Sequence, residues 1–189
     1  KSDWDSFING TFVDSKVPLE KKVNNKKYML SIRYDNKFNF SLPKGFGNNQ
    51  MIYFELKKLL SSVDSIRNFD DLPIPLRIIT TDLNTGQAVA MKEGDLAKVI
   101  TASVAIPTLF EPVEIDNRLY VDGLVSRNFP VIDVINMGAD IIIGSDVGNE
   151  VKDKKDYNIL SVLNQLVAIQ SASSTSEQRE LTSILITPD

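Results

Sequence analysis

The sequence predicts an α/β fold in which helices pack against a mixed sheet. Segments that alternate apolar and polar residues are interspersed with segments whose apolar residues recur at helical spacing. The nearly continuous apolar run 139–147 is typical of a strand covered on both faces in a parallel sheet. With 189 residues and 42% hydrophobic content, the chain can bury one substantial core, so we expect one domain or most of one.

The first third of the chain predicts a hairpin, a helix and an extended connector. Residues 28–34 and 37–42 alternate apolar and polar side chains around Asp35-Asn36, a dipeptide suited to a tight turn. Residues 50–61 space their leucines at helical intervals. The connector 69–75 is expected to be extended, because each proline disfavours helical conformation in the residue before it.

The middle of the chain predicts two strand pairs separated by a helix. The β-branched run 76–82 and the run 87–91 flank a turn, and 94–105 has the spacing of a helix that Pro107 ends. Residues 111–115 and 118–121 form the second predicted hairpin.

The last third predicts alternating helices and strands. A short helix near 130–137 ends at Gly138 and leads into the strand 139–147. A longer helix begins at Ile159 and is expected to fade within the Ser-rich stretch 171–176, before a last strand over 183–187.

The composition excludes several kinds of chemistry. The chain has no histidine and no cysteine, which rules out Ser-His-Asp and Cys-His sites, disulfides and Cys/His metal sites built from these residues. A Ser/Asp pair remains compatible with the composition. The net charge of -4 and the lack of a sustained Lys/Arg run argue against a nucleic-acid partner.

Asp122 is the leading candidate for chemistry. It precedes Gly123 at the end of a predicted strand, where glycine allows a sharp turn and the carboxylate projects from the rim of the sheet. A general base can take a proton from a serine hydroxyl at such a position. An ordinary Asp-Gly turn is the alternative interpretation of these two residues.

Other polar residues are interpreted as structural. Asp82 stands at a strand end, but the following Asn84, Thr85 and Gly86 predict that it serves the turn. Ser103 lacks a glycine elbow and lies near a helix end. Asp146 with Gly148 predicts a turn, with a secondary polar site as the alternative.

Four motifs in order carry a resemblance to a known family. The first is Leu72-Pro73-Ile74-Pro75-Leu76-Arg77 followed by Thr81-Asp82-Leu83-Asn84-Thr85-Gly86-Gln87. The second is the helix end Ile100-Thr101-Ala102-Ser103-Val104-Ala105-Ile106-Pro107 with Phe110-Glu111-Pro112-Val113. The third is Val121-Asp122-Gly123-Leu124 with Asn128-Phe129-Pro130-Val131, and the fourth is Met137-Gly138-Ala139-Asp140-Ile141-Ile142-Ile143. Together they resemble the patatin-like phospholipase family, specifically its bacterial branch related to neuropathy target esterase. The match is densest from about Phe69 to Gly148.

The resemblance implies a patatin-like three-layer α/β/α fold with a mixed, mainly parallel central sheet. It also implies a lipid acyl hydrolase, of phospholipase A or lysophospholipase type, that uses a Ser/Asp dyad. Asp122 would be the general base, within the motif Asp122, Gly123 and Leu124. Leu124 departs from the family pattern, which has Gly or Ala there, and leucine is unsuited to positive φ.

The family's remaining catalytic parts are expected upstream of Trp4. They are a Gly-rich loop for the oxyanion and a G-x-S-x-G nucleophile elbow, and no G-x-S-x-G occurs in the 189 residues. We therefore expect residues 1–189 to be the C-terminal portion of one catalytic domain, inactive when isolated.

The resemblance also sets expectations for ligands and partners. The substrate would be a phospholipid or other acyl ester at a membrane surface, with no metal or cofactor, and a homodimer is allowed. Phe38, Phe40, Leu42 and Phe46 could line the acyl entrance, with ordinary packing as the alternative. The bacterial relatives include cytoplasmic, membrane-associated and outer-membrane autotransporter proteins, so the sequence leaves the location open. A non-catalytic binding or regulatory module of the same fold, and an esterase or acyltransferase for soluble acyl esters, are the alternative functions.

Overall fold

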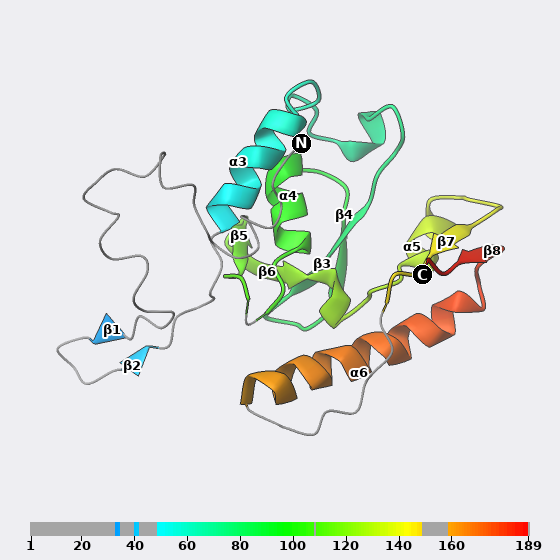
Figure 1. Ribbon diagram of the computed structural model, residues 1–189. Helices are drawn as coiled ribbons and strands as arrows, with labels where there is room; N and C mark the ends of the chain where they lie inside the picture. Colours follow the sequence, from blue (N-terminus) through cyan, green and yellow to red (C-terminus); the bar gives the residue numbers. More distant parts are fainter. Residues whose placement is uncertain (1–32, 35–39, 42–48, 108, 149–158, 189) are drawn as a thin grey trace.

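The computed structural model describes residues 33–34, 40–41, 49–107, 109–148 and 159–188, and Figure 1 shows their arrangement. A four-stranded sheet lies at the centre, with α4 against it on one side, α3 against α4, and α6 running past the other end of the sheet (Figure 1). The α/β class predicted from the sequence is confirmed.

The central sheet has the strand order β4-β3-β6-β5, and every neighbouring pair is antiparallel. Its strands are β3 (Ile78–Asp82), β4 (Ala88–Met91), β5 (Val113–Ile115) and β6 (Arg118–Asp122). In the pairing of β3 with β6, Thr80 lies opposite Asp122 and Thr81 lies opposite Val121. This register places Asp122 at the end of β6, beside the middle of the fully buried strand β3.

Short turns join two of the three antiparallel strand pairs of this sheet, β3 with β4 and β5 with β6. Asp116 and Asn117 join β5 to β6 with φ values of 48° and 61°, the left-handed conformation that a two-residue hairpin of this kind needs. Gly86, with φ 71°, lies in the connection from β3 to β4. Connections this short leave room only for antiparallel neighbours. The central pair β3–β6 is also antiparallel, although residues 83–117 separate its strands, so the expected parallel majority is wrong for this sheet.

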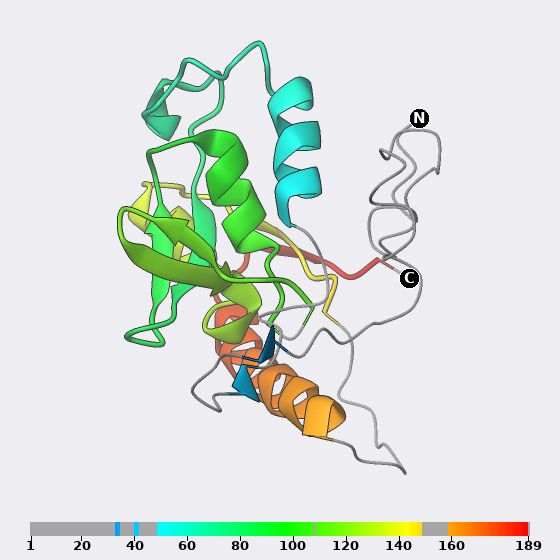
Figure 2. The same cartoon turned by 90° about the vertical axis from the view of Figure 1, so that its left-hand side faces the viewer.

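Helix α4 (Leu96–Ser103) packs on β3, β5 and β6, and α3 (Asn49–Leu59) packs on α4, as the two views of Figures 1 and 2 show. The side chain of Asp95 caps α4 by accepting a hydrogen bond from the N–H of Lys98 at 3.1 Å. The core between α4 and the sheet consists of Phe69, Ile78, Leu96 and Val99.

The connector before β3 is only partly extended, which corrects the prediction for 69–75. Phe69–Asp71 forms the short 3-10 helix η2, because the side chain of Asn68 accepts the N–H of Asp70 and caps this turn. Extended backbone begins at Leu72. Phe69 is fully buried in the core, so η2 anchors the connector.

The C-terminal third contains η3 (Gly123–Val125), α5 (Val131–Asn136), β7 (Ile143–Ser145), α6 (Ile159–Arg179) and β8 (Ile184–Ile186). Strands β7 and β8 pair in parallel, as the apolar run predicts. However, β7 is shorter than expected and one of its faces is exposed, with Ile143 in the strand at 65% and Ile141 just before it at 71%. Within the described residues, β7 pairs with β8 along one edge. The expectation that both faces of β7 are covered is therefore wrong for this part of the chain.

Two further outcomes concern segments near the ends. Helix α6 continues through the Ser-rich stretch 171–176 to Arg179 instead of fading there, because its C-terminal part packs on η3 and α5.

The N-terminal hairpin is confirmed at β1 (Arg33–Tyr34) and β2 (Phe40–Ser41), which pair antiparallel. The other residues predicted for that hairpin lie outside the described part of the chain.

Candidate active site

Asp122 ends β6 and begins a tight turn. Its backbone has φ -49° and ψ 136°, and its N–H donates to the carbonyl of Ala105 at 3.1 Å, which ties it to the segment after α4. Gly123 follows because the chain passes directly over β3 here. A Cβ at this position would lie 2.6 Å from the carbonyl oxygen of Ile79, which is too close for any side chain.

The Asp122 carboxyl is half-buried and has a single described hydrogen bond. Its Oδ1 accepts the N–H of Leu124 at 2.9 Å, which caps η3. Among the described residues, Oδ2 accepts no hydrogen bond and no Lys or Arg forms an ion pair with it. Burial raises the pKa of Asp122 above its ordinary value, and the Leu124 N–H opposes this only in part.

Leu124 does not distort this turn. The only described non-glycine residues with positive φ are Asp116 and Asn117, so leucine occupies η3 without left-handed backbone strain. Its N–H supplies the hydrogen bond to Asp122. The departure from the family pattern at this position is therefore compatible with an ordered Asp122 carboxyl.

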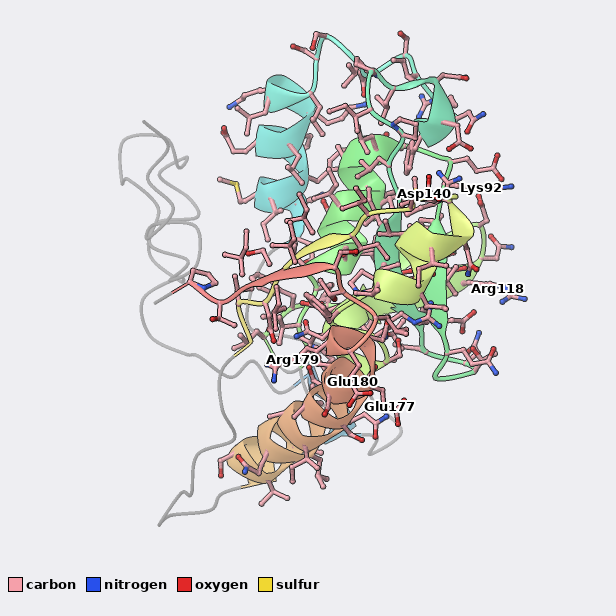
Figure 3. All side chains as sticks on the ribbon, turned by 90° about the vertical axis from the view of Figure 1, so that its right-hand side faces the viewer. Lys92, Arg118, Asp140, Glu177, Arg179 and Glu180 are labelled. Carbon is pink, nitrogen blue, oxygen red and sulfur yellow. The ribbon has the colours of Figure 1, made fainter. Side chains whose placement is uncertain are left out.

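Asp82 has a structural role, as predicted. Its Oδ1 accepts the N–H groups of Asn84 at 2.8 Å and Thr85 at 3.3 Å, which fixes the turn. Its Oδ2 lies 2.8 Å from Nη1 of Arg118, whose exposed side chain is labelled in Figure 3. Burial raises the pKa of Asp82, but the N–H of Asn84 and the Arg118 guanidinium outweigh it, and the pKa falls below its ordinary value.

Asp146 is held in a similar way. Its Oδ1 accepts the N–H of Gly148 at 2.8 Å, and its Oδ2 pairs with Arg179 near the end of α6 (Figure 3). Burial raises the pKa of Asp146, whereas the Gly148 N–H and the Arg179 guanidinium lower it to a net value below normal. This aspartate forms the turn that the sequence predicts, together with an ion pair that the sequence did not indicate.

Ser103 is also structural. Its hydroxyl donates to the carbonyl of Ile79 at 2.7 Å, which joins the last residue of α4 to β3. This hydroxyl holds the helix to the sheet, and its printed partner among the described residues is a backbone carbonyl, not a carboxylate. The structure does not test the prediction that four aromatic and aliphatic residues line the acyl entrance. Phe38, Leu42 and Phe46 lie outside the described residues, and for Phe40 only the backbone in β2 is described.

Two hydroxyl residues near Asp122 were missed by the sequence reasoning. The hydroxyl of Thr81 donates to the Asp122 carbonyl at 2.9 Å and lies 2.8 Å from Oγ of Ser126. These hydrogen bonds tie the turn after β6 to Thr81 of β3. The spacing in the sequence is compatible with this contact, because a serine four residues after Asp122 can reach back to a neighbouring strand. However, the spacing alone does not indicate which strand lies beside Asp122.

The described residues contain no group of three or more acidic residues placed to hold a metal ion. The helices within this part of the chain include none that is both long and apolar enough to span a membrane.

Comparison with known proteins identifies the family. A family model described as patatin-like phospholipase matches residues 5–135, more than half of the 189-residue chain. The chain belongs to the patatin-like phospholipase family. The matched range ends within α5 and contains Asp122 and its turn.

Individual relatives agree with this family. An uncharacterized NTE family protein of Mycobacterium tuberculosis is 33% identical over 124 residues, covering 61% of this chain and 34% of that protein. Patatin-like phospholipase domain-containing protein 7 of Mus musculus is 31% identical over 101 residues, covering 51% of this chain and 7% of that protein. The human domain-containing protein 6 is 31% identical over 88 residues, which cover 44% of this chain and 6% of that protein. The chain thus spans about a third of the length of the mycobacterial relative.

Proposed function

We propose that this patatin-like chain contributes the general base of a phospholipase A or lysophospholipase that uses a Ser/Asp dyad. The observation that carries the proposal is the state of the Asp122 carboxyl. It lies half-buried at a strand end with a raised pKa, whereas Asp82 and Asp146 are each neutralised by an arginine and have lowered pKa values. A carboxylate without a cation is the better proton acceptor.

In the proposed reaction, Oδ2 of Asp122 accepts the hydroxyl proton of a serine as the serine oxygen attacks the acyl carbonyl. The alcohol leaves with a proton, an acyl-enzyme forms, and water then hydrolyses it. The serine is supplied by a G-x-S-x-G element outside these 189 residues. Oδ1 stays bonded to the Leu124 N–H and keeps the carboxyl oriented while Oδ2 exchanges the proton.

Burial of the carboxyl supports this role because an ordinary aspartate is a weak base at neutral pH, with a pKa near ~3.9. Removing water from the carboxylate raises that value and strengthens the base. The substrate we propose is a phospholipid or related acyl ester presented at a membrane or micelle surface, because the chain belongs to the patatin-like phospholipase family.

The test replaces Asp122 in the full-length protein. Asp122→Asn keeps the side chain's shape and the oxygen that caps η3, while Asp122→Ala removes both. We expect each variant to lose at least about 100-fold in kcat/KM on phospholipid and lysophospholipid, the range seen when a general base is removed. Asp140→Asn, an exposed aspartate beyond α5, is the matched control and should keep wild-type activity.

Activity measured on lipids and on soluble esters distinguishes the proposed lipid hydrolase from the alternative functions. Full activity of both Asp122 variants would contradict the dyad. Wild-type turnover of short soluble esters, without activity on either lipid, would support an esterase or acyltransferase instead. A folded full-length protein that hydrolyses none of these esters would favour a non-catalytic binding module.

A further inference from the structure

A pocket of about 440 Å³ lies beside η3, and Asp122 is not among its lining residues. Gly86 and Gln87 line it from the connection between β3 and β4, Ala88 from the start of β4, and Val125 from η3. Ser126 and Arg127 line it from the segment after η3, and Gln170 from α6. Asp122 shares a sheet face with Thr80, whereas Ser126 bonds to Thr81 on the other face. The pocket is therefore distinct from the proposed base.

The lining of this pocket is polar and contains no carboxylate. Gln87 and Gln170 bring two amide groups and Arg127 brings a guanidinium. Each of these groups can donate hydrogen bonds. An acyl chain would leave these donors without partners, which is unfavourable. The donors instead match a ligand that carries several anionic oxygens.

Arg127 is held ready for such a ligand. Its Nη1 lies 2.8 Å from both carboxylate oxygens of Asp133, a buried residue of α5. Among the described residues, Nε and Nη2 of Arg127 form no hydrogen bond. Asp133 thus fixes the guanidinium, and the remaining N–H groups can meet two oxygens of one phosphate.

Ser126 requires that the ligand also carry a hydrogen-bond donor. The Thr81 hydroxyl gives its single proton to the Asp122 carbonyl, so the proton between Thr81 and Ser126 comes from Ser126. The oxygen of Ser126 then has an acceptor site left over and no proton to donate. It matches a hydroxyl group on the ligand.

From these groups we propose that the pocket binds a phosphate ester that also carries a hydroxyl group, as in glycerol phosphate or a glycerophosphate lipid head group. The guanidinium and the two amides bind the phosphate, and Ser126 accepts the hydroxyl. This site goes beyond the proposed acyl hydrolysis, and its occupancy is measured without turnover.

The test uses the full-length protein and isothermal titration with glycerol 3-phosphate at constant ionic strength. Gln170 is exposed on α6, and both Lys and Glu suit a helix, so Gln170→Lys and Gln170→Glu form a matched pair. We expect Gln170→Lys to tighten binding and Gln170→Glu to weaken it, each by about threefold to tenfold at low salt. Absence of saturable binding to the wild type, or equal effects of the two substitutions, would overturn the proposal.

Ser126→Ala tests the hydroxyl contact. We expect this variant to lose the preference for glycerol 3-phosphate over inorganic phosphate while it still binds both. An unchanged preference would contradict the role of Ser126. Binding should also persist in Asp122→Asn, so that failure of the acyl hydrolase proposal and failure of this one can be told apart.

A competition experiment identifies the source of the ligand. Vesicles of phosphatidylglycerol are added to the complex with glycerol 3-phosphate, with phosphatidylcholine vesicles as the control, because the choline head group has no hydroxyl. Displacement by phosphatidylglycerol alone assigns the pocket to a lipid head group. Lack of displacement by either vesicle assigns it to a soluble phosphate ester.

Discussion

At the scale of single residues, the aspartates of this chain divide by their partners. Asp82 and Asp146 are buried beside arginines, and their carboxylates hold turns together. Asp122 has one backbone N–H and no described cation. Burial without a cation is unfavourable for an ionised carboxyl. The fold therefore bears a loss of stability at Asp122 that the other two aspartates avoid, which is typical of a residue retained for chemistry.

This difference predicts that Asp122→Asn stabilises the protein at neutral pH. Because the folded pKa is raised, the protonated carboxyl adds stability below the unfolded pKa of about 3.9, and that stability is lost as pH rises through the folded pKa. Asparagine keeps the cap on the Leu124 N–H without the charge. We expect the Tm to rise by about 1–3 °C at pH 7, with no rise near pH 3.

Thermal unfolding of the wild type, Asp122→Asn and Asp140→Asn at both pH values measures this effect. Asp140 is exposed, so its variant controls for the loss of one negative charge from the surface. A Tm for Asp122→Asn that is lower than wild type at pH 7, or a gain that is equal at both pH values, would show that burial of the charge is not the cause.

At the scale of elements, the junction of β6 with η3 is the part that packing defines most tightly. The backbone of Gly123 passes over Ile79 so closely that a Cβ would lie 2.6 Å from its carbonyl oxygen and 2.9 Å from its Cγ2. The hydrogen bonds from Thr81 to the Asp122 carbonyl and from Asp122 to Ala105 hold the same junction. The position of Asp122 therefore depends on contacts with β3 and with the segment after α4.

We expect Gly123→Ala to destabilise the protein by about 1–3 kcal/mol, the usual result of forcing an extra methyl into a packed site. The turn must move away from β3, which displaces Asp122, so kcat should fall as well. Chemical denaturation and lipid hydrolysis assays measure both effects. Leu124→Ala is the control, because it removes atoms from the same turn, and it should keep most of the activity. A stable and fully active Gly123→Ala protein would contradict the close packing.

The elements also show which features of the fold can be predicted from sequence. The hairpin at Asp116-Asn117 and helix α4 were predicted well, because local turn chemistry and apolar spacing specify them. The exposure of β7 and the full length of α6 depend on tertiary neighbours, which local patterns do not contain. For the candidate site, Asp122 was predicted, but the bonds from Thr81 and Ser126 connect residues more than 40 positions apart.

At the scale of the whole molecule, α4 covers one face of the sheet, and η3 leads from Asp122 past the polar pocket to α5. Asp122 begins this segment on the face that it shares with Thr80, and the polar pocket with Arg127 follows on the other side. A patatin-like hydrolase built on this frame would hold its acyl ester near Asp122. A hydroxyl-bearing phosphate ester would bind separately, beside α6.

The pH dependence of kcat/KM for lipid hydrolysis by the full-length protein tests the role of Asp122 most directly. In the proposed dyad only the ionised carboxylate accepts the serine proton, so kcat/KM should fall as pH drops through the pKa of Asp122 in the free enzyme. Because burial raises that pKa, the midpoint should lie above about 3.9. We predict that this acidic limb is absent from the residual activity of Asp122→Asn. The same limb in both proteins would contradict the assignment of Asp122 as the base.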